Sequence, residues 1–146
     1  MKFAFERFRF IILVGCFFLT TKSFSQNNRF WATYYGGTDN DDGRSVATDI
    51  FGNVYLAGVT RSISGIASGG FQNTFGGGVY AGDAYLVKFD ANGNRLWATY
   101  YGGAGDENGF AVITDALGNV YLAGETRSVS GIASGGFQNT GGGAFN

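Results

Sequence analysis

Short runs of alternating apolar and polar residues, separated by polar stretches rich in glycine, make up the chain after its first 25 residues. Runs of this length, with many β-branched and aromatic residues, are typical of β-strands, and none continues long enough at helical period to predict a helix. Within one stretch of the chain we expect four strands, at residues 45–49, 54–60, 84–89 and 95–101. Both sides of the last two runs are largely apolar, which predicts a sheet that is covered on both faces.

The chain repeats itself with a period of 66 residues. Residues 29–80 align without a gap on residues 95–146, and 35 of the 52 aligned residues are identical. Trp31, for example, returns as Trp97. Self-similarity at a fixed period is the signature of repeat architectures. We therefore divide the region from Gln26 onward into copies at 29–94 and 95–146, and the second copy is truncated before its third and fourth strands.

Three turns share the pattern D-x-x-G-N, at 49–53, 90–94 and 115–119. The aspartate can accept backbone N–H groups of the turn, and the glycine can adopt the positive φ that closes a tight hairpin. We interpret these aspartates as turn residues rather than as ligands or catalysts. The other two connections, 61–83 and 102–110, are long and are expected together at the opposite end of the sheet. A local function is expected at that long-loop end.

Residues 1–25 have the pattern of a secretory signal peptide. Basic residues precede an apolar run at 10–19, which is shorter than the roughly 20 residues that a membrane-spanning helix requires. Ser23 and Ser25 are the small residues of a cleavage site. The mature chain is therefore expected to begin at Gln26 and to be secreted or held at the cell surface.

A lipid anchor on Cys16 is the alternative, because residues 13–16 resemble a bacterial lipobox. The apolar segment continues through residues 17–19, however, whereas a lipobox normally ends such a segment. The signal-peptide interpretation is preferred for this reason.

Composition narrows the chemistry further. The chain has 26 glycines, no proline and 14% charged residues, a balance that favours an all-β fold. It has no histidine, which is the usual general base and the commonest metal ligand. Outside residues 1–25 there are six basic and ten acidic side chains without a basic cluster, so nucleic acid is not expected as a partner. We predict no enzyme activity, catalytic residue, cofactor or metal site.

Two loops offer alternatives to this prediction. The acidic loop 39–43 resembles a calcium loop, but it lacks EF-hand spacing, and positions 105–109 of the second copy change the ligand set. We interpret both as solvated polar loops. The Gly-rich loop 64–74, which recurs unchanged at 130–140, contains no nucleotide-binding motif.

Packing is the expected role of the aromatic residues in these segments. Ile66 and Phe71 are predicted to fix the Gly-rich loop to the sheet. Both tryptophans and two tyrosine pairs lie inside strand-like runs, so we expect them between sheets rather than on a sugar: Trp31, Tyr34, Tyr35, Trp97, Tyr100 and Tyr101.

The stretches WATYYGG, DIFGNVYLAGVT, FQNTFGGG and DAYLVKFDANGNRLWATYYGG resemble the seven-bladed β-propeller (SBBP) repeat of secreted and surface proteins of bacteria. The resemblance implies four-stranded antiparallel blades and an extracellular setting, and it brings no catalytic motif. The chain would hold one complete blade, an extra strand at 30–35 and half a blade, which is about one and a half to two blades. Open apolar faces and strand edges are then expected, with self-association through the open blade edges.

The predicted function is that of an exported, non-catalytic repeat protein or fragment, acting as a scaffold for protein or glycan interaction or adhesion at the bacterial cell surface. The alternatives are a fragment of a propeller enzyme and a non-functional gene remnant. The partner itself, a protein or a glycan, is not specified by the sequence.

Overall fold

The computed structural model describes residues 30–78, 80 and 82–141, so the predicted signal peptide at 1–25, with Cys16, and the predicted start at Gln26 lie outside the described residues. In the described part the fold is all-β, as predicted, and no helix there is long and apolar enough to cross a membrane. There are six described strands: β1 (Asp41–Thr48), β2 (Val54–Thr60), β3 (Asp83–Phe89), β4 (Arg95–Tyr101), β5 (Glu107–Thr114) and β6 (Val120–Thr126).

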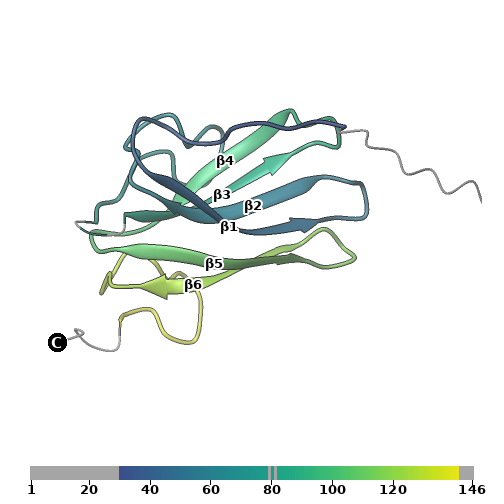
Figure 1. Ribbon diagram of the computed structural model, residues 1–146. Helices are drawn as coiled ribbons and strands as arrows, with labels where there is room; N and C mark the ends of the chain where they lie inside the picture. Colours follow the sequence, from purple (N-terminus) through teal and green to yellow (C-terminus); the bar gives the residue numbers. More distant parts are fainter. Residues whose placement is uncertain (1–29, 79, 81, 142–146) are drawn as a thin grey trace, which may run out of the picture.

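The strands form two antiparallel sheets (Figure 1). One sheet has the order β1-β2-β3-β4, which is the predicted four-stranded unit, and β5 and β6 form a separate hairpin. β1 begins four residues earlier than predicted, because Asp41 pairs with Thr60 across a bulge after Gly43. The hairpin repeats this register, with Glu107 opposite Thr126.

The D-x-x-G-N turns have the predicted construction. In each turn the aspartate carboxylate accepts two backbone N–H groups and the side-chain amide of the asparagine, at 2.7 to 3.0 Å. The glycines have φ of 79°, 87° and 83°. The Asn119 amide and the backbone N–H groups hold the pKa of Asp115 below its ordinary value, because they stabilise the charged form. These aspartates are confirmed as turn residues.

One side of the first sheet, which we call its front face, carries an apolar cluster: Val54, Leu56, Tyr85, Val87, Phe89, Ala98 and Tyr100. Two parts of the chain cover this face. Segment 30–37 places the Trp31 ring 5.8 Å from Phe89, and the long loop between β2 and β3 contributes the fully buried Ile66.

The opposite side, the back face, carries Tyr55, Ala57, Leu86 and Trp97. The hairpin covers this face with its own front-face residues, which are Val112, Val120 and Leu122. Two hydrogen bonds join the layers, because Ser45 Oγ accepts from the Val112 N–H at 3.1 Å and Thr114 Oγ1 donates to the Thr48 carbonyl at 2.8 Å. The first sheet is therefore covered on both faces, as its composition predicts.

The predicted extra strand at 30–35 is wrong. The described residues 30–40 have no strand assignment, because no neighbouring strand lies beside them to complete a ladder. The segment nevertheless packs as its repeat equivalent does. Tyr35 donates its hydroxyl hydrogen to the Ile66 carbonyl at 2.8 Å, and Tyr101 makes the same bond to Ile132 at 2.8 Å. Segment 30–37 thus takes the place of the fourth strand of a preceding blade.

The outer edge of β4 is not open, contrary to the sequence-based expectation. Ala98 exchanges two backbone hydrogen bonds of 2.9 Å with Ser68, and the Tyr100 N–H donates to the Gln72 carbonyl at 3.0 Å. The glycines of this loop permit the close approach, since a Cβ on Gly70 would lie 2.4 Å from the Ala98 carbonyl oxygen. In the described part of the chain β6 pairs only with β5, whereas its repeat equivalent β2 pairs with both β1 and β3. This difference is predicted for the incomplete second copy.

Candidate interaction site at the long-loop end

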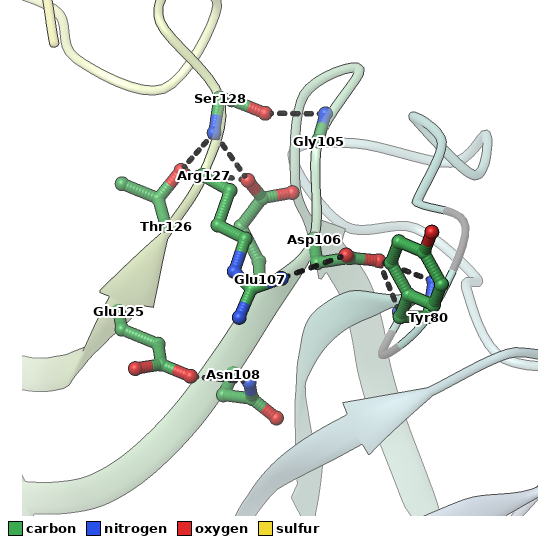
Figure 2. A network of polar contacts seen from close by, with 10 residues as sticks. Tyr80, Gly105, Asp106, Glu107, Asn108, Glu125, Thr126, Arg127 and Ser128 are labelled. Carbon is green, nitrogen blue, oxygen red and sulfur yellow. Dashed lines mark hydrogen bonds and ion pairs between the residues drawn. The ribbon is translucent and has the colours of Figure 1, made fainter. Parts of the chain in front are cut away.

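The long connections meet at one end of the two sheets, opposite the tight turns (Figure 1). A network of hydrogen-bonded carboxylates organises this end (Figure 2). Glu107, which is 2% exposed, accepts from the Gly103 N–H at 2.9 Å and from the Thr126 hydroxyl at 2.6 Å. Ser128 Oγ accepts in turn from the Gly105 N–H at 2.8 Å. These bonds fix the connection that leads from the first sheet into the hairpin.

The first copy has the same network 66 residues earlier. Asp41 accepts from the Gly37 N–H at 2.7 Å, from Ser62 Oγ at 3.0 Å and from the Thr60 hydroxyl. Ser62 Oγ also accepts from the Asp39 N–H at 2.8 Å. The carboxylate at this position is therefore a structural acceptor in both copies, with glutamate replacing aspartate in the second.

The interpretation of the acidic loops as solvated is wrong for two residues. Asp106 and Glu107 are 6% and 2% exposed, because backbone N–H groups and hydroxyls replace water around them. Asp106 accepts from the Tyr80 N–H at 2.9 Å and faces the Arg127 guanidinium at 3.8 Å (Figure 2). The described residues contain no group of three or more acidic side chains arranged to hold a metal ion.

Asp83 was not singled out from the sequence. It is fully buried at the start of β3, where one carboxylate oxygen accepts from the Gly76 N–H at 2.7 Å and the other oxygen has no hydrogen-bond partner. Burial raises the pKa of Asp83 to about 6, and the nearby Glu107 carboxylate adds to the rise. Because the side chain is inaccessible, it cannot contact a ligand in this conformation. The sequence signal was an aspartate that opens an otherwise apolar strand.

A polar hollow of about 390 Å³ lies beside this network. Its lining comes from the start of β1 and the residue before it, the end of β2, the long connection that follows β2 and the start of β5: Asn40, Asp42, Arg44, Val59, Arg61, Tyr80 and Asn108. Arg44 lies 3.9 Å from Asp42 and 5.5 Å from the Phe110 ring centroid, so its guanidinium is held in place. Arg61 is exposed and forms no ion pair with a described residue. The hollow therefore offers hydrogen-bond donors and acceptors on a fixed frame.

The aromatic predictions are only partly correct. Ile66 fixes the Gly-rich loop, but Phe71 is 85% exposed and Phe75 packs in its place, 5.9 Å from Tyr100. Trp31, Tyr35, Trp97 and Tyr100 pack as expected. Tyr34 is fully exposed, because it lies on the outward side of segment 30–37. The Gly-rich loop lacks a periodic pattern that distinguishes Phe71 from Phe75.

A four-stranded antiparallel meander with a second copy stacked against one face is the arrangement of successive β-propeller blades. Residues 31–63 match the family described as "SBBP: Beta-propeller repeat", which confirms the resemblance seen in the sequence. The match begins at Trp31 and extends past β1 and β2 to Ile63. This part of the chain is therefore similar to an SBBP β-propeller repeat. No curated protein matches the chain.

Proposed function

We propose that the chain is an exported, non-catalytic scaffold that binds a glycan or protein at the bacterial cell surface through its long-loop end. The polar hollow carries this proposal, because arginine, asparagine and tyrosine side chains meet there from the start of β1, from the long connection 61–83 and from the start of β5. Binding groups that are mounted on a rigid scaffold and presented by loops are a common arrangement for recognition. The Asp41 and Glu107 networks supply the rigidity.

Of the two classes of partner, the hollow is better suited to an acidic glycan. Among the described residues Arg61 forms no ion pair, and a guanidinium binds carboxylate or sulfate groups with paired hydrogen bonds. Asn40 and Tyr80 add neutral donors and acceptors of the kind that bind sugar hydroxyls. Catalysis forms no part of the proposal, since the hollow has no histidine, and the buried Asp83 does not line it.

Export rests on the sequence of residues 1–25. The intact mass of the chain recovered outside the cytoplasm is expected to correspond to a start at Gln26. A lipid-modified Cys16 at the N-terminus would instead place the protein on a membrane anchor.

Binding is tested with immobilised acidic and neutral polysaccharides. The wild-type chain should bind the acidic polymer, and Arg61→Ala should weaken this binding roughly tenfold because it removes a charge-assisted hydrogen-bond donor. Arg127→Ala is the matched control, since Arg127 is the repeat equivalent of Arg61 but is paired with Asp106 outside the hollow. Equal losses in both variants, or no binding to either polymer, would argue against the hollow as the site.

A further inference from the structure

The two copies present the same residues to different surroundings. Tyr55 on the back face of the first sheet is 1% exposed, whereas its equivalent on the hairpin, Tyr121, is 53% exposed. Ala57 is fully buried and its equivalent Ala123 is exposed. The back face of the hairpin, which also carries the 62% exposed Ile113, therefore has the composition of a packed face without the packing.

The opposite difference occurs on the front faces. Val112 of the hairpin is 3% exposed because it packs on the back face of the first sheet, whereas its equivalent Val46 in β1 is 64% exposed. Segment 30–37 covers the part of the front face around Phe89, but it leaves Val46 open. One chain thus carries both halves of an interface that it also forms internally: an open back face at Tyr121 and an open front face at Val46.

We infer that the hairpin back face of one chain binds the Val46 front face of a second copy of the same chain, head to tail. The contact would continue the internal interface by one further repeat. Tyr121 of the first chain would take the position of Tyr55, and Val46 of the second chain would take that of Val112. Such a contact is heterologous, because it joins two different surfaces of the same chain. This inference is independent of the proposed glycan binding.

The polar groups of the internal interface are largely compatible with this docking. Within the chain, the Thr114 hydroxyl donates to the Thr48 carbonyl. Both repeat positions are threonine, so the Thr48 hydroxyl of the second chain can make the equivalent bond to the Thr114 carbonyl of the first chain. The Ser45 bond is not repeated, because Ala111 stands at the equivalent position. The centre of the interface remains apolar.

Charged residues lie at the long-loop end of the proposed interface. Glu125 takes the position of the buried Val59, and the Asn108 side chain donates to it at 2.7 Å (Figure 2). In the docked pair, Glu125 and Arg127 of one copy lie near Asp42 and Arg44 of the other, by analogy with the lining of the hollow. These four charges cancel, and Asp106, which faces Arg127 at 3.8 Å, leaves one net negative charge at this end, which the apolar centre of the interface has to outweigh.

In this docking the second chain keeps its own segment 30–37 in place. Segment 30–37 of the second chain would take the place of a fourth strand. β5 and β6 of the first chain would provide the first and second strands of the same blade. None of the described residues fills the third-strand position between them. Each chain then contributes two blade positions. Because propellers close with about four to eight blades, a ring needs about two to four chains.

Light scattering on the purified chain tests this assembly. We expect a discrete particle of about two to four chains that dissociates on dilution. Tyr121→Asp and Val46→Asp should each abolish association, because each places a charge at the centre of one half of the interface. Phe71→Asp, which also replaces an exposed apolar residue but lies outside both faces, should leave association unchanged.

Mixing the two charged variants is the decisive step. Each variant keeps the face that the other has lost, so the mixture should form a 1:1 dimer that does not grow further. Tyr121 and Val46 are both exposed in the single chain, so the variants should fold, and thermal melting in dilute solution checks this. Tyr121→Ser and Val46→Ser provide a second pair of variants without added charge. A monomeric wild-type chain, open-ended growth, a dimer of either charged variant alone, or a mixture that stays monomeric would each overturn the inference.

Discussion

Tyr55→Ala should lower the free energy of unfolding by about 3–5 kcal/mol, the usual cost of truncating a buried aromatic side chain. The Tyr55 ring is 1% exposed, lies 6.3 Å from the Trp97 ring and has the Lys88 ammonium 5.0 Å above it. Its hydroxyl also donates to Asp49 at 3.1 Å. The substitution leaves a cavity between the first sheet and the hairpin.

Tyr121→Ala is the matched control, because it removes the same side chain from the same repeat position. Tyr121 makes the equivalent hydroxyl bond to Asp115 at 3.0 Å but is 53% exposed. Its truncation should cost less than about 1 kcal/mol, as is usual for surface positions. Urea unfolding of both variants, at a concentration where the wild-type chain is monomeric, measures the difference. Equal costs would mean that the hairpin does not cover Tyr55.

Asp83 should make the protein less stable as the pH rises from about 4 to about 6. Burial raises the pKa of Asp83 from 3.8 to about 6 in the folded state, so the folded chain holds the proton more tightly than the unfolded chain. Stability from this group is fully present below the unfolded-state pKa and is lost as the pH passes through the folded-state pKa. The expected loss is at most about 3 kcal/mol, from about 1.4 kcal/mol for each pKa unit.

Asp83→Asn should remove this pH dependence and stabilise the protein at pH 7, because an amide remains neutral. It retains a carbonyl oxygen for the Gly76 N–H. Thermal or urea unfolding between pH 4 and pH 8 measures both effects, and Asp42→Asn, at an exposed carboxylate, is the control that should keep the wild-type profile. A flat wild-type profile, or an Asp83→Asn variant that keeps the slope, would show that another group is responsible.

Features that depend on local sequence could be predicted. The four strand runs at 45–49, 54–60, 84–89 and 95–101 and the D-x-x-G-N turns are confirmed, because a strand pattern and a turn aspartate express their preferences within a few residues. The packing of both faces of the first sheet also followed from the apolar composition of its strands. The matched family repeat at 31–63 agrees with these features.

Features that depend on distant partners could not be predicted. Residues 30–35 have the composition of a strand, but a strand also needs a neighbour, and none lies beside them. The covering of the β4 edge could not be predicted because its partner is an irregular loop, with Ser68 and Gln72 at the bonding positions. Asp106 was expected to be solvated because its N–H donor at Tyr80 comes from a separate loop, and Glu107 because its hydroxyl donor, Thr126, lies on the neighbouring strand.

The candidate site was located only in outline. The separation of tight turns from long loops correctly indicated that the long connections share one end, and the polar hollow lies at that end. The individual lining residues could not be inferred, since Arg61 and Asn108 are 47 positions apart and meet only because the hairpin stacks on the first sheet. The sequence predicted solvated polar loops here, whereas the structure shows the Glu107 carboxylate buried and bound to backbone and hydroxyl groups.

The stacking of the two repeats by opposite faces is the central claim, and hydroxyl-radical footprinting of Tyr55 and Tyr121 tests it most directly. The two tyrosines are chemically identical and occupy equivalent repeat positions, so any difference in oxidation rate reports their accessibility. In dilute Val46→Asp protein, which should remain monomeric, Tyr121 is expected to be oxidised many times faster than Tyr55, in line with exposures of 53% and 1%. Similar rates at the two positions would contradict the stacking, because they would show that the hairpin leaves the back face of the first sheet open to solvent.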